Sequence, residues 1–109
     1  MKKIDKESAQ AFFTGKPFKK GNTVVIINER FVGLTLHGHM IAKRIPGENH
    51  ISLSNAGWQT VTTKSRLNAI LSMYGATRIW QTNFEWSLHP CPGGTPTPFP
   101  TDEFYEVKI

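Results

Sequence analysis

The sequence has a single cysteine, Cys91, and no long apolar run. One thiol cannot form an internal disulfide, and a secreted domain of this size often carries several, so we expect a reducing compartment. No stretch approaches the roughly 20 apolar residues that a membrane-spanning helix needs. Residues 1–7 also lack the apolar stretch of a secretory signal. These absences predict a cytoplasmic protein with no membrane segment.

Signatures of the common catalytic sites are also missing. The sequence has no Gly-x-Ser-x-Gly nucleophile elbow and no glycine-rich phosphate loop. Its acidic residues are few and scattered, so they suggest no carboxylate pair for acid–base catalysis. Cys91 stands between two prolines, in a segment with no positive helix end to activate the thiol. We therefore expect a protein that is not an enzyme and uses no cofactor.

The histidines do not have the spacing of a metal site. His37 and His39 would share one face of a strand, and His50 or Cys91 could supply a third ligand. A zinc site needs four such ligands, and no second pair stands at that spacing. If Gly38 bends the chain, the shared face disappears as well. We expect no metal, and a histidine that hydrogen-bonds to a neighbouring turn or helix.

The composition that is present is that of a folded domain. The chain has 109 residues, of which 39% are hydrophobic, 11% aromatic and 19% charged. This balance is typical of a globular protein rather than a disordered one. The length suits one ordinary domain and is too short for two separate cores. We predict a single domain over residues 1–109.

Positive charge is concentrated at the start of the chain. The formal net charge is +5, and residues 1–20 hold six lysines against Asp5 and Glu7. Such an excess attracts nucleic acid or an acidic protein surface over a distance that salt shortens. These two classes of partner are the ones that the charge favours. The six lysines are Lys2, Lys3, Lys6, Lys16, Lys19 and Lys20.

Two helices are predicted from their end signals and periodicity. Asp5 can cap a short helix that runs to about Phe13 and stops at Gly15. A second helix begins near Thr62 or Thr63, either of which can be its N-cap, and closes at Gly75. Its apolar stripe repeats at the spacing of one helical face. The stripe consists of Leu67, Ile70, Leu71 and Tyr74.

The remaining apolar runs predict strands joined by turns. Residues 23–27, 31–37, 40–44 and 51–53 read as an antiparallel meander, 77–81 and 84–88 as a hairpin, and 104–109 as a closing strand. Prolines and glycines in residues 89–103 exclude regular structure and indicate a loop insertion. The predicted fold is α+β, a curved antiparallel sheet of about five to seven strands. The main helix packs on one face, and the short N-terminal helix covers an edge or the open end.

The start of the second helix is a candidate anion site. Helix N-termini present free amide groups and partial positive charge, and hydroxyl groups and full charges accompany them here. The contrasting interpretation is that the threonines cap the helix and the arginine pairs with a carboxylate. Further cations would steer a partner toward the site. The proposed contacts are Thr62, Thr63, Lys64 and Arg66, and the steering charges are Lys16, Lys19, Lys20, Lys43 and Arg44.

Aromatic residues near the C-terminus permit two interpretations. Trp80, Phe84 and Trp86 could form a stacking surface for unpaired bases, or they could complete the core. The segment 89–103 could be an inert loop, or an arm that presents Phe99 to a protein partner. Trp80, Trp86 and Phe99 are therefore the candidate residues for partner binding.

Several short motifs resemble a widespread group of small uncharacterised proteins from tailed bacteriophage genomes. The resemblance covers residues 21–68. It implies a phage or prophage origin, a conventional small fold and a role in the cytoplasm of the infected cell, and it transfers no catalytic residue. The motifs are Gly21-Asn22-Thr23, Leu34-Thr35-Leu36-His37-Gly38, Ile41-Ala42, Asn55-Ala56-Gly57-Trp58 and Thr62-Thr63-Lys64-Ser65-Arg66-Leu67-Asn68.

The combined observations predict a small basic binding protein that acts early in phage infection. It would contact nucleic acid, or an acidic site on a host protein that handles nucleic acid, without reading base sequence. The alternative is a protein–protein inhibitor or virion component that uses the 89–103 arm and exposed aromatics and binds no nucleic acid.

Overall fold

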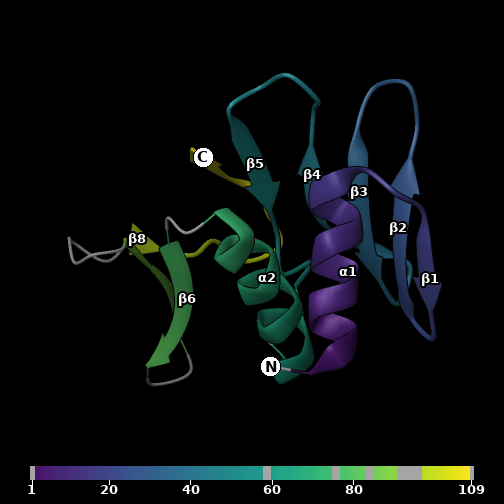
Figure 1. The fold of residues 1–109 in the computed structure, drawn as a ribbon. Coiled ribbons are helices and arrows are strands. Elements are labelled where there is room, and N and C mark those ends of the chain that lie inside the picture. Colours follow the sequence, from purple (N-terminus) through teal and green to yellow (C-terminus); the bar gives the residue numbers. More distant parts are fainter. Residues whose placement is uncertain (1, 58–59, 75–76, 83–84, 91–96, 109) are drawn as a thin grey trace.

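A computed structural model of the chain describes residues 2–57, 60–74, 77–82, 85–90 and 97–108. Within these residues it has two helices and nine strands (Figure 1), so the predicted α+β class is confirmed. In chain order the elements are α1 (Lys3–Thr14), β1 (Phe18–Lys20), β2 (Thr23–Ile27), β3 (Val32–Leu36), β4 (His39–Arg44), β5 (His50–Leu53), α2 (Val61–Tyr74), β6 (Thr77–Thr82), β7 (Glu85–Pro90), β8 (Thr97–Pro98) and β9 (Tyr105–Lys108).

The strands form two antiparallel sheets. The larger has the order β1-β2-β3-β4-β5-β9, and the smaller has the order β6-β7-β8. Strands β1 to β5 follow one another as hairpins because short turns connect their apolar runs. Strand β9 returns to pair with β5, with Val107 opposite Ile51. The predicted antiparallel sheet is confirmed, and the 77–88 hairpin stands apart from it in the smaller sheet.

The proline-rich segment 89–103 is not wholly irregular, and this corrects the sequence prediction. Thr97 and Pro98 form β8, which pairs with Leu88 and Ser87 of β7. The amide of Phe99 then donates to the carbonyl oxygen of Trp86 at 3.0 Å. Proline is tolerated here because β8 is an edge strand, where one side needs no ladder hydrogen bond. The interior of the segment, residues 91–96 with Cys91, lies outside the described residues.

A tight turn joins β3 to β4 at His37 and Gly38. Both residues have positive φ, 53° and 79°, which is typical of a two-residue type I′ hairpin turn. The predicted corner at Gly38 is therefore confirmed. The amide of His37 donates to the carbonyl oxygen of Asn22 at 2.9 Å, and the Asn22 side chain bonds to Nε2 of His37 at 3.0 Å. These bonds tie the β3–β4 turn to the β1–β2 turn.

Gly38→Ala is expected to lower the free energy of unfolding by about 1 kcal/mol, because a Cβ disfavours the left-handed conformation. The side chain would meet no neighbour, so the effect comes from the backbone alone. Urea denaturation followed by circular dichroism measures it. Gly38→Asn is the matched control, since asparagine tolerates positive φ, and it should lose clearly less stability. Equal losses for the two variants would contradict this explanation.

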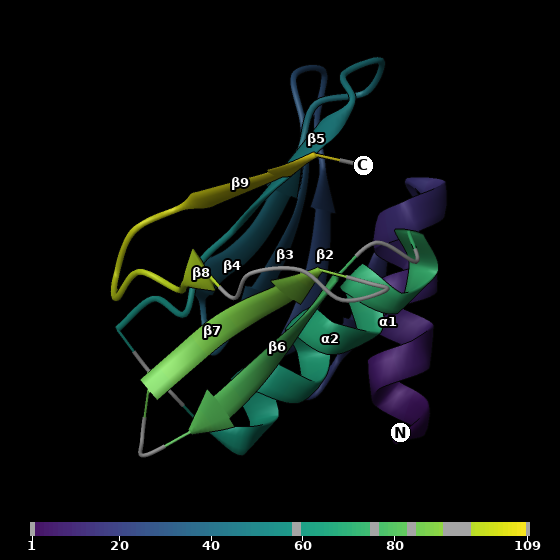
Figure 2. The same cartoon turned by 90° about the vertical axis from the view of Figure 1, so that its left-hand side faces the viewer.

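Both helices lie on one face of the larger sheet and run in the same direction (Figures 1 and 2). Near their N-terminal ends Asp5 of α1 pairs with Arg66 of α2. Near their C-terminal ends the rings of Phe13 and Tyr74 meet edge to face, with centroids 5.2 Å apart. The expectation that the N-terminal helix covers an edge or the open end is therefore wrong. It packs beside α2 because Ala9 and Phe12 bury one side of it.

The two helices begin at other residues than the sequence predicts. Lys2 is the N-cap of α1, and Asp5 lies inside the first turn, where its carboxylate accepts from the amide of Lys2 at 3.3 Å. Helix α2 is capped by Thr60, whose hydroxyl accepts from the amide of Thr63 at 3.1 Å. The stop of α1 at Gly15 is confirmed by its φ of 73°. Gly75 lies outside the described residues.

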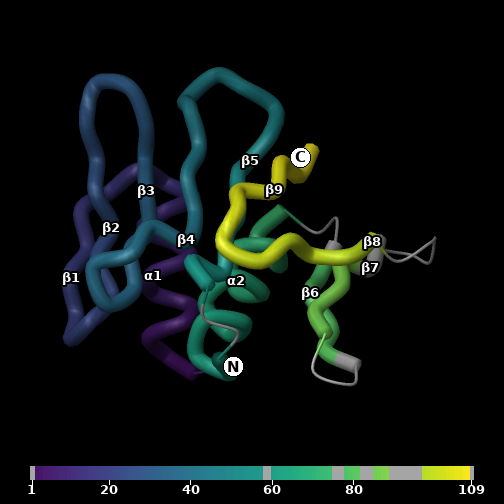
Figure 3. Tube along the Cα trace, turned by 180° about the vertical axis from the view of Figure 1, so that it is seen from behind, coloured from purple at the N-terminus to yellow at the C-terminus, as the bar shows by residue number. Residues whose placement is uncertain are grey.

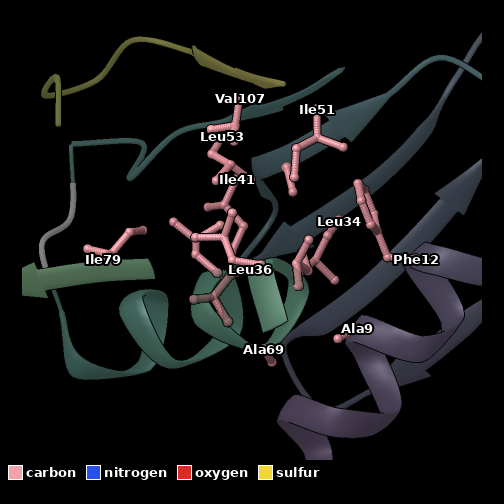
Figure 4. Packing of buried hydrophobic residues seen from close by; sticks show 14 of the residues in the cluster. Ala9, Phe12, Leu34, Leu36, Ile41, Ile51, Leu53, Ala69, Ile79 and Val107 are labelled. Atoms are coloured by element: carbon pink, nitrogen blue, oxygen red, sulfur yellow. The ribbon is translucent and has the colours of Figure 1, made fainter. Parts of the chain in front are cut away.

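The core lies between the larger sheet and the helices and continues into the smaller sheet. Figure 4 shows Leu34, Ile51 and Phe12 pointing into this space from the sheet and from α1. Ile79, Trp86, Leu88 and Phe99 extend the same buried cluster into the smaller sheet. From α2 the cluster takes Leu67, Ile70 and Leu71, which confirms three of the four residues of the predicted apolar stripe. The fourth, Tyr74, is partly buried and packs against it.

Candidate functional site

The N-terminal ends of both helices lie at one end of the larger sheet. The turns at 21–22 and 37–38 share that end, since neighbouring strands are antiparallel. Thr23, beside the first turn, accepts a hydrogen bond from Nε of Arg66 in α2 at 3.2 Å, and Arg66 reaches Asp5 in the first turn of α1. We call this end, at the bottom of Figure 1, the basic end; it comprises residues 2–6, 20–22, 37–39 and 60–64.

Lysines surround the basic end and outnumber the carboxylates near it, of which Glu7 pairs with Lys20 and Asp102 lies exposed beside Gly57. Lys2, Lys3 and Lys6 are exposed in and before the opening turns of α1. Asp5 is fully buried against Arg66 and offers no charge to solvent. Because the strands are antiparallel, Glu29 and Glu48 lie in the turns at the opposite end of the sheet. The basic end therefore carries a local excess of positive charge.

Three of the predicted cations lie at or beside the basic end. Lys64 is half-buried, its Nζ donates to the neutral Oε1 of Gln81 at 3.3 Å, and no carboxylate among the described residues forms an ion pair with it. Lys20 is exposed and pairs with Glu7 at 3.6 Å, a surface contact that contributes little. Lys19 is exposed on β1, one residue away. These lysines remain available to a partner.

Arg66 is buried and already paired inside the protein, so it is not accessible to an external anion, and this corrects the sequence prediction. Its side chain is 5% exposed, pairs with the buried carboxylate of Asp5 and bonds to the hydroxyl of Thr23. The sequence permits the contrasting interpretation that Arg66 pairs with a carboxylate of its own chain, and the structure confirms this pairing. Arg66 therefore joins α1, α2 and β2, and its charge is satisfied inside the protein.

The two threonines of the predicted site have different roles. Thr63 is buried, and its hydroxyl lies 2.9 Å from that of the N-cap Thr60, so it belongs to the cap and is not exposed to a ligand. Thr62 is half-buried and lines a hollow. The amides of Val61 and Thr62 fall in the first turn, where no intrahelical acceptor exists. The start of α2 therefore still presents donors beside the hollow.

Arg44 and Lys43 lie away from the basic end. Nε and NH2 of Arg44 donate to the carbonyl oxygens of Phe12 and Phe13 at 2.9 and 3.0 Å, so Arg44 caps the C-terminal end of α1. Burial raises the pKa of the nearby Tyr74 hydroxyl, an effect that Arg44 partly opposes, so the tyrosine stays neutral at physiological pH. Hydrogen bonds to neutral carbonyl oxygens do not cancel the charge of Arg44, so its role as a steering charge stays a prediction, although Arg44 lies away from the basic end.

Lys43 projects from the sheet face that both helices leave open. Figure 3 shows this face from behind, with the strands in front of the helices. The Nζ of Lys43 lies 5.6 Å from the ring centroids of both Phe31 and Phe104. It forms cation–π contacts on this face. Lys43 is therefore separated from the lysines of the basic end.

The candidate aromatic residues are mostly part of the core. Trp86 and Phe99 are buried, with ring centroids 5.7 Å apart, and Phe99 also contacts Tyr105 at 6.2 Å. Neither can serve as an exposed anchor, so the prediction of partner binding at Trp86 and Phe99 is wrong. Trp80 is 47% exposed, and its ring centroid lies 4.5 Å from Cζ of the Arg78 guanidinium. Phe84 lies outside the described residues.

A hollow of about 450 Å³ opens at the basic end, next to the start of α2. Its walls consist of Leu36, His37, His39, Ile41, Asn55, Ala56, Thr60, Thr62 and Thr63. Sequence reasoning did not find this hollow and assigned the two histidines no functional role. The available signal was that four of the five phage-like motifs contribute to its walls, through Leu36 and His37, Ile41, Asn55 and Ala56, and Thr62 and Thr63.

The structure offers no metal centre among the residues it describes. Within them, no group of three or more His, Cys, Asp or Glu side chains is arranged to hold a metal ion. Among the same residues, neither helix has the length and apolar character needed to cross a membrane.

Comparisons with known proteins identify one relationship. No curated protein and no solved structure matches the chain. The family described as Kyanoviridae Gp96 protein matches residues 1–108, nearly the whole chain. This agrees with the phage origin that the resemblance implies. The chain therefore belongs to the Kyanoviridae Gp96 protein family, a family of phage proteins.

Proposed function

We propose that this phage protein is a small basic binding protein whose basic end contacts the phosphates of nucleic acid. The observation that supports the proposal most is the parallel packing of α1 and α2, which brings two helix N-termini and their lysines to the same end. Each N-terminus adds partial positive charge to the full charges of the side chains. Phosphate is one of the anions that helix N-termini bind.

The exposed cations at the basic end are lysines, and lysines favour a phosphate backbone as partner over a protein surface with carboxylates at fixed positions. Arginine provides the planar, paired donors that fit carboxylates with defined geometry, whereas lysine acts as a point charge. Arg44 and Arg66 are occupied inside the protein, and the basic end exposes lysines instead. Point charges on flexible stems suit a regular phosphate backbone and carry no base specificity. An acidic surface of a host protein is the competing partner that the test must distinguish.

A titration with charge-reversed variants tests the proposal. In Lys3→Glu/Lys6→Glu/Lys64→Glu we expect the affinity for a labelled single strand to fall by roughly tenfold to a hundredfold at low salt, measured by fluorescence anisotropy. The logarithm of the association constant falls linearly with the logarithm of the salt concentration, and each phosphate contact with a single strand contributes about 0.7 to the magnitude of that slope. Losing three contacts should therefore reduce the magnitude of the slope by about 2. The three lysines lie on exposed or half-exposed helix surface, so the fold should survive.

The matched control reverses three cations at the opposite end, in Lys16→Glu/Arg30→Glu/Lys108→Glu. Lys16 follows the C-terminal end of α1, Arg30 lies in the β2–β3 turn and Lys108 pairs opposite His50. The net charge changes equally, so general attraction falls equally in the two variants. Equal loss of affinity in both would contradict a site at the basic end. Capture of an acidic host protein without nucleic-acid binding would contradict the proposal altogether.

The proposal gives the protein a binding role and no catalytic one. It places that role in the cytoplasm of the infected cell, where nucleic acid is accessible. Its affinity would be strongly salt-dependent, because the attraction acts between exposed lysines and phosphates.

A further inference from the structure

The hollow at the basic end differs from the lysine surface around it because part of its wall is apolar. Leu36 of β3 and Ile41 of β4 are buried, and Ala56 completes the apolar wall. Its volume of about 450 Å³ is in the range of pockets that take small organic ligands, about 300–1,000 Å³. A phosphate alone would not need an apolar wall of this kind. The hollow therefore suits a ligand with both an apolar face and a polar group.

Some polar groups of the hollow are committed to the protein itself. The Asn55 side chain bonds to the amides of Gly57 and Asp102 and to the carbonyl oxygen of Pro100, at 2.8, 2.9 and 3.3 Å. The hydroxyls of Thr60 and Thr63 bond to each other. These three side chains shape the hollow and are not free to hold a ligand.

Other polar groups of the hollow remain available. His37 uses Nε2 on Asn22, which leaves Nδ1 for another contact. Within the described part of the chain, the imidazole of His39 and the hydroxyl of Thr62 make no hydrogen bond. Two planar imidazoles and one hydroxyl therefore surround the apolar wall. Histidine rings stack on unpaired bases and hydrogen-bond to base edges in single-strand recognition.

We propose that the hollow holds one unpaired nucleotide of the nucleic acid that the basic end contacts. The base lies against Leu36, Ile41 and Ala56, within reach of the imidazoles of His37 and His39. The phosphate lies toward the hydroxyl of Thr62 at the start of α2. The inference depends on the proposed function and adds to it a preference for unpaired strands, because a paired base cannot leave its stack without cost.

A titration of the isotope-labelled full chain with single 5′-mononucleotides, followed by NMR, tests the inference. We expect the backbone amide signals of residues 36–41, 55–56 and 60–63 to shift. Inorganic phosphate lacks the base, and the corresponding nucleosides lack the phosphate. Each should therefore bind at least about tenfold more weakly than the mononucleotide. Equal shifts with inorganic phosphate would overturn the inference, since the hollow would then be an anion site only.

A matched pair of variants locates the binding. Thr62→Trp places a large ring in the hollow, whereas Val61→Trp places it on the neighbouring residue, which is 74% exposed and not in the wall. Mononucleotide binding should be lost in the first variant and kept in the second. If Thr62→Trp does not fold, His39→Ala is the second variant, and it should weaken binding by about tenfold. Unchanged binding in the folded variants would overturn the inference.

Strand binding by the unaltered protein separates the inference from the proposed function. If the protein binds single strands through the basic end but no mononucleotide enters the hollow, the inference fails and the proposed function stands. If it binds neither single nor double strands, the proposed function fails, and the inference fails with it. Single strands should bind at least about tenfold more tightly than duplexes of equal length, whereas equal affinities would overturn the inference.

Discussion

Replacing Arg66 with alanine is expected to lower the free energy of unfolding by about 3–5 kcal/mol, because it leaves the carboxylate of Asp5 buried without its partner. Asp5 is fully buried, and Arg66 is 5% exposed. The same change removes the hydrogen bond from Nε of Arg66 to Thr23. A loss of this size is a large part of the stability of a small domain. Chemical denaturation followed by circular dichroism measures it.

Two further variants separate the buried pair from other effects. Lys64→Ala changes a half-buried cation in the same helix, and we expect a loss below about 1 kcal/mol. Asp5→Leu/Arg66→Met removes both charges and should recover most of the stability, since no unpaired charge remains. If Arg66→Ala costs no more than Lys64→Ala, Arg66 is not the buried link between α1, α2 and β2, and it returns as a candidate anion contact.

Asn55→Ala is expected to lower the free energy of unfolding by about 3 kcal/mol or more. The side chain bonds to Gly57, Asp102 and Pro100, and it is fully buried. Removing it breaks three part-buried hydrogen bonds, each of which contributes roughly 0.5–1.5 kcal/mol, and leaves a cavity where the fully buried side chain was. The same bonds hold residues 100–102 beside the 54–57 loop, so the loss should also loosen β9. Hydrogen exchange of the Val107 amide, together with denaturation, measures both effects.

The control for Asn55 is Asn22, an exposed asparagine with side-chain bonds to His37 and Thr23. Solvent can replace these bonds, so Asn22→Ala should cost less than about 1 kcal/mol. Comparable losses in the two variants would show that the buried bonds of Asn55 do not hold the C-terminal segment in place.

The fold was predictable where the signals are local. The β-branched run of residues 23–27 and the turn at Gly38 specify a strand and a hairpin through nearest neighbours alone. The start of α2 was predictable only as a short range, because Thr60, Thr62 and Thr63 can each cap a helix. The cap falls on Thr60, whose hydroxyl contacts both the amide and the hydroxyl of Thr63. No local rule distinguishes these three threonines.

The errors at the site come from contacts between distant residues. Asp5 and Arg66 are 61 positions apart, and only their packing shows that each satisfies the other. Arg44 reaches the end of α1 across 31 residues or more. Phe99 follows prolines that suggest an exposed arm, yet it packs on Trp86. Lys64 and Thr62 were placed correctly at a helix start, whereas the hollow requires three separate segments to meet.

The most direct test of the central claim is NMR mapping of a single-stranded oligonucleotide on the full chain at low salt. If the basic end binds phosphates, the amide signals of residues 2–6, 20–22, 37–39 and 60–64 shift first, and added salt reverses the shifts. Signals from the turns at 28–31 and 45–49, at the opposite end of the sheet, should stay unchanged. Shifts centred on those turns or on Trp80, or no shifts at all, would contradict the account.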